Sequence, residues 1–182
     1  MKIGRVTKHW NKNCLAVGLS QGFIEPLEAT ALLFIQQTAA AFTDVLLQGD
    51  LSEAAHERFN ARVNEHFEGT RDYIVTHYKT NSRTDTDYWR ANAANLRLSD
   101  PLKQLLSLWM SGKGIAPPVR KQMLGRGYPV FSWYSIMAGM GIFPDIGDNL
   151  LDRSAANYRD HREVLTNIPP RRNADSLQVY FW

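Results

Sequence analysis

The chain has 182 residues, of which 44% are hydrophobic and 21% charged, and its formal net charge is +3. This length and composition are typical of one globular domain with its own core and exclude a chain that is disordered throughout. One cysteine excludes an internal disulfide, and the lack of a run of about 18 uncharged apolar residues argues against a membrane span.

Residues 1–19 predict short strands. Ile3 and Val6 are separated from the apolar run 14–17 by polar residues, a pattern typical of two strands around a turn. We expect these strands to present unpaired edges, which predicts poor solubility or a partner. Cys14 lies in the second run and is expected to be a small buried hydrophobe. The first residues carry charge but no apolar signal region, which favours a cytoplasmic protein.

Residues 14–31 predict a strand, a glycine-permitted turn and the start of a helix. Gly18 and Gly22 suit the turn. Pro26 fits the first helical position, where its missing N–H is unpaired anyway. We expect Glu25 at or near the N-cap, with Glu28 reaching back to its N–H. On spacing alone these carboxylates are an ordinary helix start.

Two long helices follow. The first is predicted from Leu27 to Gln48, with Gly49 as its stop, and its first half is apolar on every side, as expected for a helix inside a fold. Asp50 to Glu53 predict the cap of a second helix that ends near Tyr78. Its histidines do not share a metal-binding spacing, so we predict no metal site.

The segment from Arg83 to Arg90 is polar and aromatic, and we interpret it as a loop in which Arg83 and Arg90 pair with Asp85 and Asp87. Ser99 then caps a short amphipathic helix that ends at Gly112. Residues 113–130 are rich in glycine and proline and predict a loop.

The stretch between Pro101 and Pro144 contains no Asp or Glu. Its few basic residues are scattered as on a solvated face, so we predict no nucleic-acid partner. An aromatic run that contains Phe131, Trp133 and Tyr134 opens a further apolar helix to about residue 138. The tail from Arg153 predicts one polar helix and a mobile terminus.

Several motifs in order resemble the C-terminal half of the flavin-dependent tryptophan halogenases. The turn carries Gly18-Leu19, Gly22-Phe23 and the run from Glu25 to Thr30. Further matching motifs are Thr70-Arg71-Asp72-Tyr73, His77-Tyr78, Arg83-Thr84-Asp85-Thr86, Trp89-Arg90-Ala91-Asn92, Ala138-Gly139-Met140-Gly141 and Pro144-Asp145. The resemblance spans about residues 4 to 145 and adds nothing beyond Asp145.

The resemblance implies a flavin-dependent halogenase that uses FADH2, oxygen and chloride or bromide to halogenate an electron-rich aromatic such as an indole. Reduced FAD would come from a separate reductase. Glu28 matches the family's catalytic glutamate, and a carboxylate suits a site where positive charge develops. Thr30 and Ala31 match the halide-binding positions, a task for amides at a helix N-terminus. Gly18 and Leu19 match positions at the flavin.

The same resemblance places the substrate pocket near Phe131, Trp133 and Tyr134, whose rings could stack on an indole; packing of these rings in the core is equally compatible with the sequence. Two positions depart from the family pattern. Ala29 and Ala31 stand where Ser and Gly are usual, and Ala31 restricts how closely the backbone approaches an anion. The G-x-G-x-x-G fingerprint is absent, so the full FAD site is not in this chain.

The sequence therefore predicts a mainly α fold: the helical C-terminal region of a halogenase, with residues 1–20 as a β remnant of the FAD-binding domain and residues 21–182 as the substrate-side domain. Its partners would be an aromatic small molecule and either the missing flavin domain or a second copy, with no membrane. A non-catalytic helical module derived from the family and a related flavin monooxygenase are the alternatives.

Overall fold

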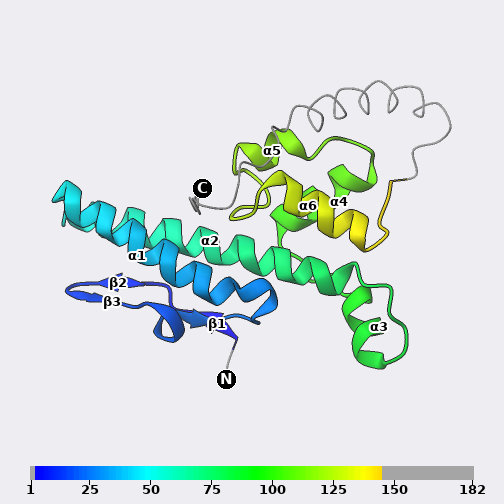
Figure 1. Cartoon of the computed structure of the whole chain (residues 1–182), viewed down its shortest axis with the longest axis horizontal. Coiled ribbons are helices and arrows are strands. Elements are labelled where there is room, and N and C mark those ends of the chain that lie inside the picture. The colour runs from blue at the N-terminus through cyan, green and yellow to red at the C-terminus, as the bar shows by residue number, and fades with distance from the viewer. Residues whose placement is uncertain (1–2, 145–182) are drawn as a thin grey trace, which may run out of the picture. The chain divides into compact units, whose positions relative to one another are not determined.

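The computed structural model describes residues 3–144, with the exception of the Glu28 side chain. Helices dominate this part (Figure 1). Their order along the chain is β1 (Gly4–Arg5), β2 (Trp10–Asn11), β3 (Cys14–Leu15), the 3₁₀ turn η1 (Gly18–Ser20), β4 (Gly22–Phe23), the 3₁₀ turn η2 (Leu27–Ala29), α1 (Thr30–Gln48), α2 (Glu53–Lys79), α3 (Asp87–Ala94), α4 (Asp100–Met110), α5 (Ala116–Arg120) and α6 (Val130–Gly139). The tail predicted from Arg153 lies outside the described residues.

The ends of the long helices are set by local chemistry. Gly49 adopts a left-handed conformation after α1, and its N–H donates to the Leu46 carbonyl, which confirms the predicted stop. Ser52 caps α2 by accepting the N–H of Ala55, and Ser99 caps α4 in the same way. The predicted starts of both helices are thus confirmed.

The strands form two separate antiparallel pairs. β1 pairs with β4, and β2 pairs with β3 in a tight hairpin. The β1–β4 pair joins residues on both sides of the predicted domain boundary at residue 20; the division itself stays a prediction.

Side chains of α2 form hydrogen bonds with the backbone of the hairpin and of the residues before it. The Asn60 side chain accepts the N–H of Trp10 at 2.8 Å and donates to its carbonyl at 2.9 Å. Asn64 donates to the Thr7 carbonyl at 3.0 Å and contacts Nε2 of the buried His9. Burial lowers the pKa of His9, because the charged ring is poorly solvated there.

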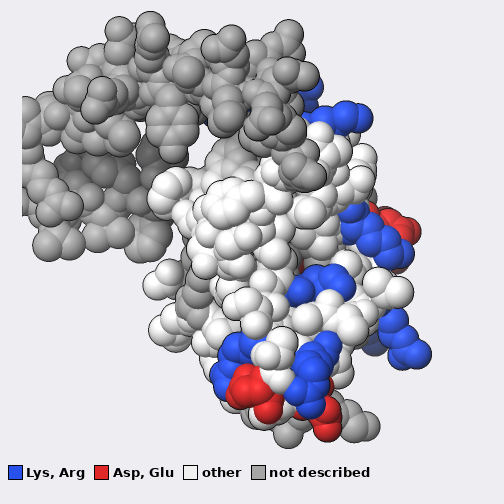
Figure 2. All heavy atoms as spheres, turned by 90° about the vertical axis from the view of Figure 1, so that its right-hand side faces the viewer, with Lys and Arg blue, Asp and Glu red and all other residues white. Residues whose placement is uncertain are grey.

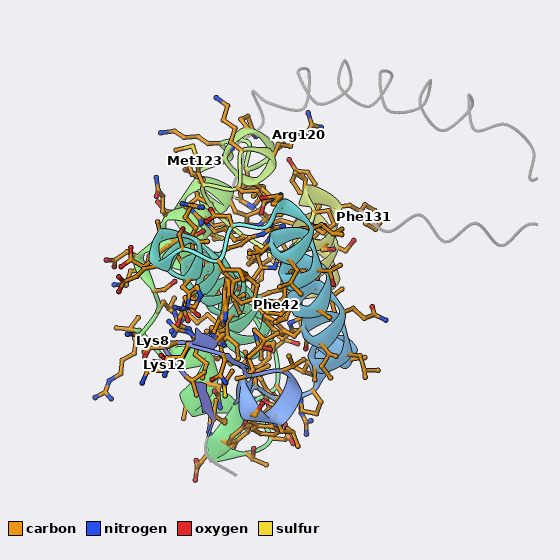
Figure 3. The ribbon with its side chains drawn as sticks, turned by 90° about the vertical axis from the view of Figure 1, so that its left-hand side faces the viewer. Lys8, Lys12, Phe42, Arg120, Met123 and Phe131 are labelled. Atoms are coloured by element: carbon orange, nitrogen blue, oxygen red, sulfur yellow. The ribbon has the colours of Figure 1, made fainter. Side chains whose placement is uncertain are left out.

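Three apolar clusters fill the interior of the part between residues 3 and 144. One joins α1, α2 and the hairpin around Trp10, with Phe42 packed edge-on against Trp10 at 5.1 Å between ring centroids (Figure 3). A second joins Ile24 and Phe34 to Phe67 and Ile74 of α2. The third and largest lies under α4, α5 and α6 and includes the fully buried Trp133. The second cluster anchors the turn before α1.

Predictions for three short segments differ from the structure. Cys14 is exposed, because it lies at the end of the hairpin and not under a helix. Residues 87–94 form α3, capped by Thr86, where a loop was predicted, although both predicted ion pairs, Arg83–Asp85 and Arg90–Asp87, are present. Residues 116–120 form α5, because consecutive prolines occupy a first turn that needs no N–H donors.

Helix α1 keeps a broad apolar face uncovered, contrary to the prediction that it lies inside the fold. Leu32 is 64% exposed and Leu47 is 82% exposed, with Leu33, Ile35 and Leu46 also exposed. Within the described residues, α2 and the N-terminal strands pack on the helix from one side only. By length and composition α1 could cross a membrane, a test that core helices of soluble proteins also pass.

Candidate active site

The predicted flavin-contacting turn is held on α1. Gly18 has a φ of +65°, a conformation that favours glycine, and a side chain there would touch Ile35 of α1. The buried Gln21 side chain exchanges hydrogen bonds with the Thr38 hydroxyl of α1, at 3.0 and 3.3 Å. Leu19, between them, is 67% exposed. The turn is therefore fixed by its contacts with α1, and Leu19 points toward solvent.

Gly22 brings the chain back against β1. A Cβ at this position would lie 2.7 Å from the Gly4 carbonyl oxygen and 2.8 Å from Cα of Arg5. Glycine is therefore required by the close approach of two backbones. Gly22 thereby sets the direction in which the chain enters the Glu25-Pro26 segment.

The segment after β4 bends sharply at Pro26. Pro26 has φ −78° and ψ 39°, and the Leu27 N–H donates to the Glu25 carbonyl at 2.8 Å. This is an inverse γ-turn. The Glu25 carboxylate accepts a short hydrogen bond from the Tyr78 hydroxyl at the end of α2. Glu25 is therefore tied to α2 and is not the N-cap of α1, which corrects the predicted capping role.

Helix α1 begins at Thr30, later than Pro26 predicts. Its N-cap is Ala29, whose φ of 55° and ψ of 26° are left-handed, and no side chain caps the helix. An alanine pays roughly 1–2 kcal/mol for this conformation. Strain of this kind at a non-glycine residue is concentrated at functional sites. The left-handed Ala29 interrupts the helix between Leu27 and Thr30, so α1 begins later than predicted.

The left-handed residue controls which amides are available to an anion. The Thr30 N–H donates to the Leu27 carbonyl, and the Thr30 hydroxyl donates to the same oxygen at 2.7 Å. The N–H and the hydroxyl of Thr30 are thus both used within the turn. Ala31 and Leu32 follow in the first helical turn, where amides have no carbonyl four residues earlier inside the helix. The halide-binding role of Thr30 and Ala31 stays a prediction, and the bonds made by Thr30 leave Ala31 as the stronger candidate of the two.

Replacement of Ala29 tests this backbone geometry. We expect Ala29→Gly to raise the free energy of unfolding by about 1 kcal/mol, because glycine adopts left-handed angles without a steric cost. The control is Ala40→Gly on the exposed side of α1, which should lower the same quantity by about 1 kcal/mol. Urea denaturation followed by circular dichroism measures both. Loss of stability in both variants would contradict a left-handed Ala29.

The catalytic assignment of Glu28 stays a prediction. Its backbone belongs to η2, directly before the left-handed Ala29, and its side chain lies outside the described part of the structure. The described residues do not fit a whole FAD. Their two-residue strands pair antiparallel and form no parallel strand–helix–strand unit, whose Gly-rich turn holds the pyrophosphate in dinucleotide-binding folds. The flavin contact of Gly18 and Leu19 stays a prediction.

The three aromatic residues predicted to line a substrate pocket are not brought together by α6. Trp133 is fully buried, and its indole N–H donates to the Gly125 carbonyl at 3.0 Å. Phe131 is 77% exposed and points outward (Figure 3). Tyr134 lies at the surface beside Trp109, with 5.6 Å between ring centroids. The substrate pocket stays a prediction, and Phe131 and Tyr134 are its accessible members.

Charged side chains are unevenly distributed over the surface. Figure 2 shows one face of the molecule on which they gather at the lower end and along the right-hand edge, next to an uncharged area. Helix α6 itself contains no Lys, Arg, Asp or Glu. An apolar aromatic molecule would meet no desolvation penalty from charged groups on such a surface.

A shallow pocket lies elsewhere, between the end of α1 and the start of α2. Its polar lining includes Asp44, Gln48, Asp50, Arg58 and Arg62. Arg58 pairs with Asp50 at 2.6 Å, which neutralises part of this lining. The pocket is more than ten residues along α1 from Thr30, about 16 Å at 1.5 Å per residue. It does not involve the predicted site residues.

Comparison with known proteins identifies the class as flavin-dependent halogenases. The family model described as tryptophan halogenase matches residues 1–156. Tryptophan 6-halogenase ThaL of Streptomyces albogriseolus is 32% identical over 154 residues, which cover 79% of this chain and 28% of the relative. Tryptophan 7-halogenase RebH of Lentzea aerocolonigenes is 29% identical, with 79% and 29% covered.

Solved structures of flavin-dependent halogenases are also similar to this chain. BrvH, a flavin-dependent halogenase from Brevundimonas sp. BAL3, superimposes with a TM-score of 0.69 at 31% identity, covering 92% of this chain and 35% of that one. The chain belongs to the tryptophan halogenase family. It spans less than a third of the length of the first two relatives, and the family match continues past Asp145, where none was expected.

Proposed function

We propose that this chain is the C-terminal part of a flavin-dependent halogenase that halogenates an electron-rich aromatic such as an indole. In this role it would supply Glu28, the amide of Ala31 and an aromatic surface for the substrate. The family match over residues 1–156 carries the proposal. The uncapped, left-handed start of α1 supports it, because this geometry leaves first-turn amides to an anion.

An FAD-binding part that lies outside these 182 residues completes the proposed enzyme. Two features support this requirement: the described residues offer no site for the ADP half of FAD, and α1 leaves its apolar face uncovered. Contiguous exposed apolar faces often mark surfaces that bind another protein. The alternative is a non-catalytic helical binding module of the same family. The uncovered apolar face of α1 favours this alternative equally, but the module would catalyse no reaction.

Complementation distinguishes these proposals. The chain would be purified alone and co-expressed with a polypeptide that carries the family's FAD-binding fingerprint. Each preparation would then receive FAD, a flavin reductase, NADH, chloride or bromide, and tryptophan or indole. We expect the chain alone to be colourless and inactive, and the pair to form a halogenated product with the isotope pattern of chlorine or bromine in mass spectrometry.

Other outcomes have defined meanings. Stoichiometric FAD in the chain purified alone would contradict the need for a further FAD-binding part. An oxygenated product without halogen would indicate a flavin monooxygenase. A stable complex that yields no product would favour the binding module.

A further inference from the structure

The turn before α1 is tied to the end of α2 by one side-chain hydrogen bond. The hydroxyl of Tyr78 donates to Oε1 of Glu25, 53 residues earlier in the chain. Glu25 directly precedes the bend at Pro26, and only three residues separate it from Ala29. This hydrogen bond therefore joins the least regular part of the motif to one of the longest helices.

Packing holds the Tyr78 ring in place independently of its hydroxyl. The ring packs against the cluster of Ile24, Phe34, Phe67 and Ile74. It also stacks on Trp89 of α3, with 5.8 Å between centroids and 17° between ring planes. Burial and the neighbouring Glu25 carboxylate raise the pKa of the Tyr78 phenol, so it stays a proton donor at neutral pH. The hydroxyl is thus presented to Glu25 by a fixed ring.

The geometry beyond Glu25 depends on where its backbone is held. The Glu25 carbonyl accepts the Leu27 N–H, and the Leu27 carbonyl accepts both donors of Thr30. The position of the Glu25 carbonyl thus constrains Leu27, and the position of the Leu27 carbonyl constrains Thr30. Displacement of Glu25 would therefore shift the Leu27 carbonyl and the left-handed Ala29 that follows.

We propose that Tyr78 is a positioning residue: its hydroxyl holds Glu25 and so fixes the turn that carries Glu28 and presents the Ala31 amide. This inference deepens the proposed function and depends on it only for the consequence on halide use. The sequence assigns Tyr78 no role and assigns Glu25 only a capping role, because nothing in the sequence shows that two residues so far apart meet.

Replacement of Tyr78 by phenylalanine removes the hydroxyl and keeps the ring. The matched control is Tyr73→Phe on the same helix, whose hydroxyl donates instead to the Ser132 carbonyl of α6 at 3.3 Å. Amide hydrogen exchange of the full chain, followed by mass spectrometry, reports on each region. We expect Tyr78→Phe to speed exchange about ten-fold in peptides covering residues 22–33, since hydrogen bonds to charged groups contribute roughly this factor or more.

The control should leave residues 22–33 at the wild-type rate and change exchange only near α6. Glu25→Gln keeps an acceptor for the Tyr78 hydroxyl but loses the charge, so its exchange rate should fall between those of the wild type and Tyr78→Phe. In the complemented enzyme, Tyr78→Phe should raise the KM for chloride about ten-fold, with a smaller change in the KM for the aromatic substrate.

Three results would overturn the proposal. Unchanged exchange in residues 22–33 would show that the hydroxyl does not hold the turn. Equally faster exchange throughout the chain would show a general loss of stability. Local loosening with an unchanged KM for chloride would show a structural bond without a role at the site. If the wild-type pair makes no halogenated product, the proposed function fails, and the exchange measurement alone decides whether Tyr78 holds the turn.

Discussion

Glu28→Gln in the complemented enzyme is expected to lower the rate of chlorination by about two to three orders of magnitude and to leave FAD binding intact. Electrophilic attack on an aromatic ring creates positive charge and releases a proton, and a carboxylate stabilises the first and accepts the second. Glutamine keeps the size of the side chain and loses both properties. Single-turnover product formation and flavin absorbance of the purified pair measure the two effects.

The control for this variant is Glu57→Gln on the exposed surface of α2, which should leave the rate unchanged. Loss of bound FAD in Glu28→Gln would instead assign Glu28 a structural role in assembling the pair. A wild-type rate with FAD retained would remove Glu28 from the chemistry altogether.

Gly69→Ala is expected to lower the free energy of unfolding by about 2–3 kcal/mol. Gly69 lies on α2 where the chain near Arg126 crosses the helix, and a Cβ there would lie 2.2 Å from the Arg126 carbonyl oxygen. Insertion of a methyl group into a packed contact between two backbones costs roughly 1–3 kcal/mol or more. The gain in helix propensity offsets at most about 1 kcal/mol of this cost.

Gly139 provides the matched control, because it ends α6 and nothing lies within 4 Å of a Cβ built there. Gly139→Ala should leave stability unchanged or raise it by up to about 1 kcal/mol. Urea denaturation followed by tryptophan fluorescence compares both variants with the wild type. Equal stability of Gly69→Ala and the wild type would mean that the loop around Arg126 does not pack on α2 as described.

The helices could be predicted because their signals are local. Capping serines, the glycine after Gln48 and the apolar stripe of α2 each act within a few residues, and the structure confirms them. The ion pairs around α3 were found for the same reason, since their partners are two or three residues apart. Periodicity is weaker where prolines and polar residues dominate, which is why α3 and α5 were missed.

The site was harder to predict because its geometry depends on distant partners. Nothing local to Ala29 indicates left-handed angles, which alanine rarely adopts. The bonds of Gln21 to Thr38 and of Glu25 to Tyr78 join residues 17 and 53 positions apart. The aromatic run of α6 was correctly predicted as a helix, but alternation around the helix sends Trp133 inward and Phe131 outward.

The exposed position of Cys14 has a practical consequence for handling the protein. An accessible thiol at the end of the β2–β3 hairpin can form disulfide-linked dimers on air oxidation, so a reducing agent belongs in the storage buffer. The same sulfur accepts a maleimide dye at one defined place per molecule. Fluorescence anisotropy of that dye would then report directly when a larger polypeptide is bound.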